Sequence, residues 1–292
     1  MNPNIPGAIR KAVEEGNVDT VRSWLADGGD AFVNETFYED ASYAQDSLLA
    51  LATRTRANRG SAMSQLLLDF GARPELDFLV NAIGIDNMET VRLLLARGID
   101  GNARYGSWTP LHYATLAGEL GPWRRADQGE CFRILLEAGA SVHARRAVSL
   151  ETPLMLAARL GFTSLDVPML LLKYGSDVNA VDDQGRTAED HARHAMQLPV
   201  WHEPHDPPKF YGDAWRGAGV VEGALALFRD YRAAGGTWKR YVTEPRKQLL
   251  VLRRLVERGR AAPPDGTLAR VQGLPDVLFW KVLAFWRSDR DV

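Results

Sequence analysis

The sequence of 292 residues has little of what secreted or membrane-spanning proteins need. It has one cysteine, Cys131, so it cannot build an internal disulfide framework, and we expect a core thiol in a reducing compartment. No run of about 18 apolar residues occurs, so we expect no membrane-spanning helix. The first residues lack the basic and apolar regions of a secretory signal peptide. We therefore predict an intracellular protein, cytoplasmic or nuclear.

No excess of charge of either sign marks the chain as a whole. Lys and Arg total 35 against 37 Asp and Glu, a formal net charge of −2, which gives no general reason to bind nucleic acid or an acidic membrane. Between Lys239 and Arg260, eight basic residues outnumber Glu244 and Glu257, but Tyr241 is the one aromatic residue among them. We interpret this stretch as the solvated face of a helix and predict no nucleic-acid partner.

Sequence motifs of catalysis are also missing. The chain has no GxGxxG, P-loop, HExxH, GxSxG or CxxC pattern, so we predict a non-enzymatic protein without catalytic residues or cofactors. Four of the six histidines lie close together in the sequence, at His191, His194, His202 and His205. They leave open a metal site, and with it a metal-dependent enzyme, but the tight Cys/His spacing of zinc sites is lacking. Ordinary surface histidines are the favoured interpretation, and we assign no metal ligand.

One short phrase recurs along the chain: an apolar triplet, a variable residue or two, and a glycine. It occurs over 24–28, 66–72, 93–98, 134–140 and 170–175. We expect each copy to be a helix with one apolar stripe that ends at a glycine in the left-handed conformation. Asn34, Asn102 and Asn179 follow three of these glycines, and an asparagine in a turn can bond its own backbone.

A second phrase alternates with the first and begins, in its best copies, with Thr-Pro before an apolar helix rich in alanine. Those copies are 109–114 and 152–158, and weaker ones are 47–52 and 187–192. Threonine followed by proline favours a helix start, with the threonine as N-cap and the proline in the first turn. We expect the helices of the two phrases to be separated by glycines, namely Gly16, Gly60, Gly118 and Gly161.

These phrases, in this order and about five times over, resemble the ankyrin-repeat family. The resemblance implies an all-α fold, a solenoid of paired helices with β-turn tips, with about six irregular repeats over residues 5–236. Extra residues near 37–40 are expected to lengthen the leading loop of the second repeat, and Asp86-Asn87 replaces a glycine in the third. A loop over 199–219 interrupts the sixth repeat; we interpret it as a packed cap, with a binding loop as the alternative.

The resemblance also implies a function, because ankyrin solenoids bind proteins with their turn tips and a concave groove. We therefore predict a monomeric, non-enzymatic interaction scaffold whose partner is another protein. Aromatic and arginine side chains are enriched at binding hot spots. The residues assigned to partner binding are Arg104, Tyr105, Ser107, Trp108, Arg145, Arg146, Asp182, Asp183 and Gln184.

Tyr105, Trp108 and His112 lie within or shortly after the first of these tips and have different expected roles. Trp108 directly precedes a helix cap, so packing across to the next turn and contact with a partner are equally open. Tyr105 lies nearer the tip and is the better candidate for a contact. His112 occupies the histidine position of Thr-Pro-Leu-His, and the resemblance implies that it bonds near the turn and ties one repeat to the next.

Residues 237–292 leave the repeat pattern and are predicted to form a helical C-terminal module. We expect a helix that starts at Thr243 and stops at Gly259, a proline turn, and a strongly apolar last helix after Leu274-Pro275. A cap that packs on the last repeat is the simpler interpretation, because terminal repeats need caps.

The order of elements in this module is also similar to the SOCS box of some ankyrin-repeat proteins. That likeness implies an alternative function, a substrate adaptor of a cullin-type ubiquitin ligase, with an elongin and a cullin as partners. Arg253 lies near the place of the usual cysteine, and the second Leu-Pro pair is absent. The docking residues of this alternative are Leu249, Leu252, Leu274, Pro275, Phe279 and Phe285.

Overall fold

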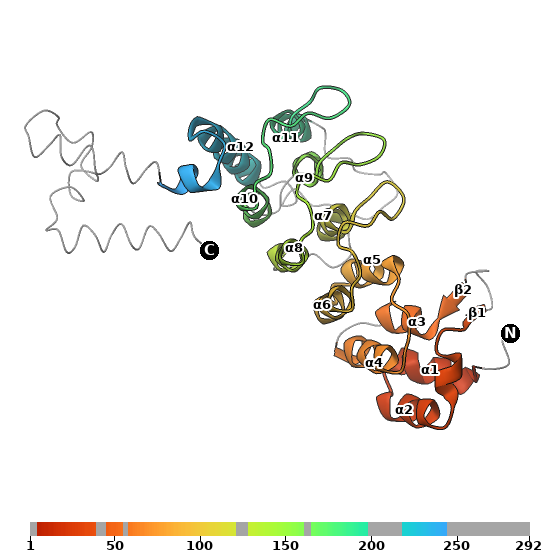
Figure 1. The fold of residues 1–292 in the computed structure, drawn as a ribbon. Coiled ribbons are helices and arrows are strands. Elements are labelled where there is room, and N and C mark those ends of the chain that lie inside the picture. Colours follow the sequence, from red (N-terminus) through yellow and green to blue (C-terminus); the bar gives the residue numbers. More distant parts are fainter. Residues whose placement is uncertain are drawn as a thin grey trace, which may run out of the picture.

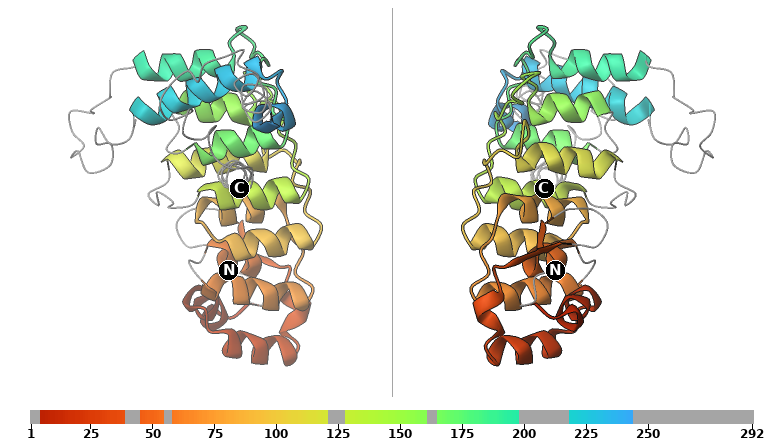
Figure 2. Two further views of the ribbon diagram at one scale, coloured as in Figure 1. Left: turned by 90° about the vertical axis from the view of Figure 1, so that its left-hand side faces the viewer. Right: turned by 90° about the vertical axis from the view of Figure 1, so that its right-hand side faces the viewer.

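The computed structural model describes residues 5–38, 45–54, 58–120, 128–160, 165–197 and 218–243. These residues form helix pairs that stack one after another (Figures 1 and 2). The first helices of the pairs are α1 (Gly7–Glu15), α3 (Leu48–Arg54), α5 (Leu76–Gly84), α7 (Pro110–Leu120), α9 (Pro153–Leu160) and α11 (Ala188–Gln197). The second helices are α2 (Val18–Ala26), α4 (Asn58–Asp69), α6 (Met88–Ala96), α8 (Gln128–Glu137), α10 (Asp166–Lys173) and α12 (Ala218–Ala233).

The helices lie in two layers. Each first helix contacts the first helices of the neighbouring pairs, and second helices from α2 to α10 contact one another in the same way. The prediction of an all-α solenoid is confirmed. The described residues contain six helix pairs, while the division of the chain at residue 236 stays a prediction.

Helix starts follow the threonine signals of the sequence. Helices α7 and α9 begin at Pro110 and Pro153, each directly after a threonine. The hydroxyl of Thr152 accepts a hydrogen bond from the backbone N–H of Met155 at 3.3 Å, as an N-cap does. In the weaker copy before α3, Ser47 takes the same role and accepts from the N–H of Ala50 at 3.2 Å.

Helix ends follow the glycines, with one aspartate in their place. After α8, Gly139 has a φ of 89°, and the N–H of Ala140 donates to the carbonyl oxygen of Leu135 at 2.9 Å. Asp86 follows α5 with a φ of 66°, so the replacement of glycine in the third repeat places a non-glycine residue in the left-handed region. The side chain of Asn87 then caps α6 by accepting from the N–H of Thr90 at 3.1 Å.

Two expectations about the glycines that separate helices were wrong. Gly60 and Gly118 lie inside α4 and α7 rather than between helices, although a glycine costs a helix roughly 1 kcal/mol. Gly161 lies outside the described residues. The segment that leads into the second repeat contains a short 3₁₀ helix, η1 (Gly29–Phe32), followed by β1 (Thr36–Tyr38), which pairs antiparallel with β2 (Gln45–Ser47). Phe37 anchors this ribbon in the core.

One continuous apolar core runs through the stack from Ile5 to Tyr231. Alanines at the contact between α9 and α11, such as Ala158 and Ala192, are fully buried and allow the two helices to approach closely. Cys131 lies in this core, as predicted.

Helix α12 is followed by a short helical segment over 238–243, with which the described part of the chain ends. Helix α12 begins at Ala218, so the last two residues of the loop expected over 199–219 are helical, and the Tyr231 hydroxyl of α12 donates to the carbonyl oxygen of Leu172 at 3.4 Å. Residues 238–243 are helical, so Thr243 lies inside a helix and does not start one; its hydroxyl donates to the carbonyl oxygen of Lys239 at 2.8 Å. Residues 198–217 and 244–292, with the rest of the expected loop and the C-terminal docking residues, lie outside the described residues.

Candidate functional site

Three turn tips project side by side from the same edge of the stack (Figure 1). They span 104–108, 145–151 and 181–186, and each joins a second helix to the first helix of the next pair. A short backbone bridge closes each tip. The N–H of Tyr105 donates to the carbonyl of Trp108 at 2.9 Å, and Asp182 donates to Arg186 in the same way at 3.0 Å.

Hydrogen bonds also join each tip to the next one. The N–H of Ala147 donates to the carbonyl oxygen of Ser107 at 3.3 Å, and the N–H of Asp183 donates to that of Ser149 at 3.2 Å. The Arg145 guanidinium reaches the third tip and donates to the carbonyl oxygen of Val181 at 2.7 Å. The three tips are therefore one hydrogen-bonded ribbon rather than separate loops.

Aromatic stacking joins the first two tips. The Arg146 guanidinium carbon lies 3.8 Å from the centre of the Trp108 ring, within the range of a cation–π contact. Trp108 also contacts Tyr113 with its ring, at 5.8 Å between centroids. Trp108 therefore packs across to the next turn, while its contact with a partner stays a prediction.

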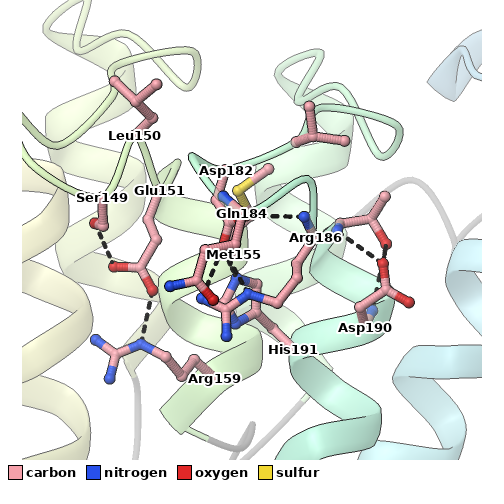
Figure 3. Close-up of polar contacts among 12 residues, drawn as sticks. Ser149, Leu150, Glu151, Met155, Arg159, Asp182, Gln184, Arg186, Asp190 and His191 are labelled. Carbon is pink, nitrogen blue, oxygen red and sulfur yellow. Dashed lines mark hydrogen bonds and ion pairs between the residues drawn. The ribbon is translucent and has the colours of Figure 1, made fainter.

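The second tip encloses a buried carboxylate, Glu151. It accepts hydrogen bonds from the Ser149 hydroxyl at 2.8 Å and from the Arg159 Nε at 2.7 Å (Figure 3). It also accepts from the Arg146 guanidinium. Burial alone would raise the pKa of Glu151, but these donors and the two positive charges outweigh it and the pKa is lowered. Arg146 is thus committed to an internal ion pair.

The third tip encloses Asp182 in a similar way, contrary to the expectation of an exposed contact residue. Its side chain is 0% exposed and accepts from the backbone N–H groups of Gln184 and Arg186, from the Arg186 guanidinium and from the Nε2 of His191 at 2.9 Å (Figure 3). Burial raises the pKa, yet the hydrogen bonds prevail and lower the pKa of Asp182 to about 2. Asp182 shapes the tip from inside and is not available to a partner.

His112 links two repeats, as the family resemblance implied. The ring is fully buried, and its Nε2 donates to the carbonyl oxygen of Glu151 at 3.2 Å, since a carbonyl can only accept. The Nδ1 therefore accepts, and the Thr109 hydroxyl donates to it at 2.8 Å. Burial lowers the pKa of His112 to about 4, so the ring is neutral at pH 7.

Asparagines provide further links that the sequence analysis assigned to local turns. The Asn102 amide donates to the carbonyl oxygen of Gly139 at 3.0 Å and accepts from the N–H of Ser141 at 2.7 Å. Asn34 makes the same pair of bonds to Gly71 and Arg73. These side chains bond the backbone of the next repeat instead of their own.

The exposed side chains of the tips are partly those predicted and partly others. Arg104, Tyr105, Asp183 and Gln184 are exposed, while Ser107 and Arg145 are half-buried. Three exposed apolar residues were not predicted from the sequence: Val148 (76% exposed), Leu150 (40%) and Val181 (42%). With Tyr105 (45%), they form an apolar set across the three tips, here named the tip row. Apolar residues inside otherwise polar turns were the signal that could have found them.

Leu150 is held in an unusual conformation within the tip row. Its φ is 53°, and it lies two residues before the cap Thr152, where the third tip has Gly185 with a φ of 74° before Thr187. A non-glycine residue in the left-handed region costs about 1 to 2 kcal/mol. The flanking bond from the N–H of Arg146 to the carbonyl oxygen of Glu151, at 2.9 Å, fixes the turn around it. Such strain at an exposed position points to a function of the side chain.

Neither a metal site nor a membrane helix is found within the described ranges. No group of three His, Cys, Asp or Glu side chains there could hold a metal ion. His191 is engaged with Asp182, while His202 and His205 lie outside these ranges. None of the helices described is both long and apolar enough to cross a membrane.

Comparison with known families identifies the repeats. A family model of ankyrin repeats in three copies matches residues 49–146, and a model of the single ankyrin repeat matches residues 149–183. No curated protein matches the chain. The matched residues hold the helix pairs from α3–α4 to α9–α10 and most of the tip row. Ankyrin repeats are protein–protein interaction modules, typically of non-enzymatic scaffolds. Residues 49–183 of the chain are therefore a run of ankyrin repeats.

Proposed function

We propose that this protein is a scaffold that binds a partner protein through the tip row. The observation that carries this proposal is the clustering of exposed apolar side chains. Of six large apolar residues exposed in the described part of the chain, four lie on three consecutive tips: Tyr105, Val148, Leu150 and Val181. Apolar side chains gathered on one surface favour an interaction site, whereas single exposed ones need no explanation.

The rigidity of the tips supports the same function. Backbone bonds join neighbouring tips, and the buried carboxylates of Glu151 and Asp182 hold their interiors. A surface that is fixed before binding loses less conformational entropy when the partner docks. The exposed Arg104, Asp183 and Gln184 lie on the first and third tips and add polar groups, as the rim of a protein interface does.

A paired-variant experiment tests this function. Proximity labelling in cells compares the natural protein with a Tyr105→Ala/Val148→Ser variant and with a Tyr174→Ala/Met196→Ser variant. The second pair removes exposed apolar side chains of similar exposure outside the tips. The proposal is supported if some cellular proteins are labelled by the natural protein and by the control variant but not by the tip variant. Equal labelling by all three contradicts it.

The second candidate function is that of a ubiquitin-ligase substrate adaptor. Its support is the sequence order in residues 237–292, with Leu249 in a basic leucine-rich stretch followed by Leu274-Pro275. Purified elongin and cullin should then bind the full chain and not a Leu249→Asp/Leu274→Asp variant that keeps its circular dichroism spectrum. No binding to the natural chain would contradict this function. The monomeric state and the cytoplasmic or nuclear location stay predictions, which light scattering and cell fractionation can test.

A further inference from the structure

We infer that the tip row binds an extended peptide segment that carries apolar anchors and one or more carboxylates, with the carboxylates at the Arg104 end of the row. This inference rests on the proposed function and adds the chemistry and the orientation of the partner. Its evidence is the distribution of unneutralised charge around the row, the strained position of Leu150 and the ribbon-like arrangement of the tips.

The charges at the first two tips are positive and incompletely neutralised. Arg104 is exposed, and Arg145 donates to the carbonyl oxygens of Val181 and Leu150 rather than to a carboxylate. Within the part of the chain that the structure describes, neither guanidinium forms an ion pair with a carboxylate. Arg146 and Arg159 share one carboxylate, that of Glu151. A partner carboxylate near Arg104 would find a charge that lacks an internal partner.

The charge at the third tip has the opposite sign. Asp183 is exposed, while Asp182 is already bonded to Arg186 and His191. Because the Arg145 guanidinium itself lies against the third tip, the asymmetry rests on the exposed residues at the two ends of the row: Arg104 attracts an acidic group of the partner, and Asp183 repels it. This asymmetry fixes the direction of an acidic segment along the row, because like charges at an interface exclude the reverse orientation.

The apolar anchor of the segment is assigned to Leu150 and Val148. Glycine would fit the positive φ of Leu150 without strain, as Gly185 does in the next tip, yet this tip presents a leucine. Its side chain stands on a turn held by the bonds of Arg146 and Glu151 and points away from the helices (Figure 3). The strained turn thus holds an exposed, branched side chain in a fixed position, two residues after Val148.

An extended segment fits this row better than a globular surface does. The three tips are bonded in line, and the apolar side chains recur once or twice per tip. A chain in extended conformation presents every second side chain to one face, so it can place apolar residues along such a row. A folded partner that contacts the row through helices is the outcome that would contradict the inference.

The test uses the full-length protein and a phage-displayed library of random 12-residue peptides. We expect the enriched peptides to combine apolar residues with Asp or Glu. A synthetic copy of the most enriched peptide is then titrated by fluorescence anisotropy. Replacing its acidic residues by Asn or Gln, or the protein's Arg104 by Gln, should weaken binding several-fold, and the loss should shrink at 0.5 M salt. Leu150→Gly should weaken binding roughly tenfold, as loss of a hot-spot anchor does.

The matched controls are Met196→Ala, which removes an exposed apolar side chain outside the tips, and Asp183→Asn, which removes the repelling charge. Met196→Ala should leave the affinity unchanged, and Asp183→Asn should keep or raise it. Failure to enrich any peptide, enrichment without acidic residues, or acidic peptides bound equally by Leu150→Gly would each overturn the inference. If the enriched peptides have no Asp or Glu but their binding depends on Tyr105 and Val148, the inference is overturned while the proposed function stands. Cellular partners that ignore the tip variants would overturn the proposed function itself.

Discussion

The Nε2 of His112 lies 3.2 Å from the carbonyl oxygen of Glu151, so the ring of one repeat bonds the backbone just before the first helix of the next. The carboxylate of the same Glu151 accepts from Arg146, whose guanidinium stacks on Trp108. Most polar groups of the tips thus form hydrogen bonds or ion pairs within the protein. The side chains left to meet a partner are apolar, together with a few charges at the rim.

His112 should make stability depend on pH. Because burial holds the pKa of the folded-state ring at about 4, against 6.5 for an ordinary histidine, the unfolded chain binds a proton more readily than the folded chain does. The contribution of His112 is therefore complete above pH 6.5 and decreases as the pH falls toward 4. The expected loss between pH 7 and pH 4.5 is roughly 2 to 3 kcal/mol.

Urea unfolding of the natural protein and of His112→Gln measures this effect. The glutamine does not titrate, and the other groups contribute alike to both proteins. The difference in free energy of unfolding between the two should therefore be largest at pH 7 and shrink toward pH 4.5. A difference that stays constant over this range would contradict the neutral, buried ring.

Asn102 should stabilise the junction between two repeats. Asn102→Ala removes one hydrogen bond to the carbonyl of Gly139 and one from the N–H of Ser141, and we expect a loss of about 1 to 2 kcal/mol in the free energy of unfolding. Asn102→Asp keeps the acceptor but places a carboxylate oxygen against the carbonyl oxygen of Gly139, and since two acceptors repel each other, it should recover little of this loss. Thermal unfolding of the three proteins at pH 7 gives the order, and equal midpoints would show that the side chain is not a link.

Two adjacent aspartates should differ sharply in their effect on stability. Asp182→Ala leaves Arg186 and the buried His191 without their carboxylate and should cost about 3 kcal/mol, as breaking a buried ion pair does. Asp183→Ala removes an exposed side chain whose backbone N–H keeps its bond to Ser149, so the change should stay within about 0.5 kcal/mol. Chemical denaturation of both variants at pH 7 measures the contrast. Similar losses would contradict the enclosed position of Asp182.

The fold was predictable because its signals are local and repeated. Thr109 and Thr152 before prolines mark helix starts, and glycines such as Gly139 allow the left-handed residue that ends a helix. The same local rule failed at Gly60 and Gly118, since a glycine tolerated inside a packed helix looks identical in the sequence to one that ends it.

The candidate site was predictable only in part, because burial at the tips depends on contacts between repeats. Asp182 looks like any polar turn residue, and its enclosure follows from His191, nine residues later on the next helix. Val148 and Val181 carry no period that distinguishes an exposed side chain from a core one. Leucine rarely adopts the left-handed conformation, so no residue preference could have predicted the positive φ of Leu150.

Leu150→Gly should leave the protein at least as stable as the natural one. Relief of the left-handed strain gains about 1 to 2 kcal/mol, while the greater freedom of glycine in the unfolded chain costs about 0.5 to 1 kcal/mol. The matched control is Val148→Gly, on the same tip but without a positive φ, which should be destabilised by about 0.5 to 1 kcal/mol. Denaturant midpoints compare the two variants with the natural protein. If Leu150→Gly were instead destabilised by more than its control, Leu150 would serve packing, and its exposed side chain would lose its claim to a binding role.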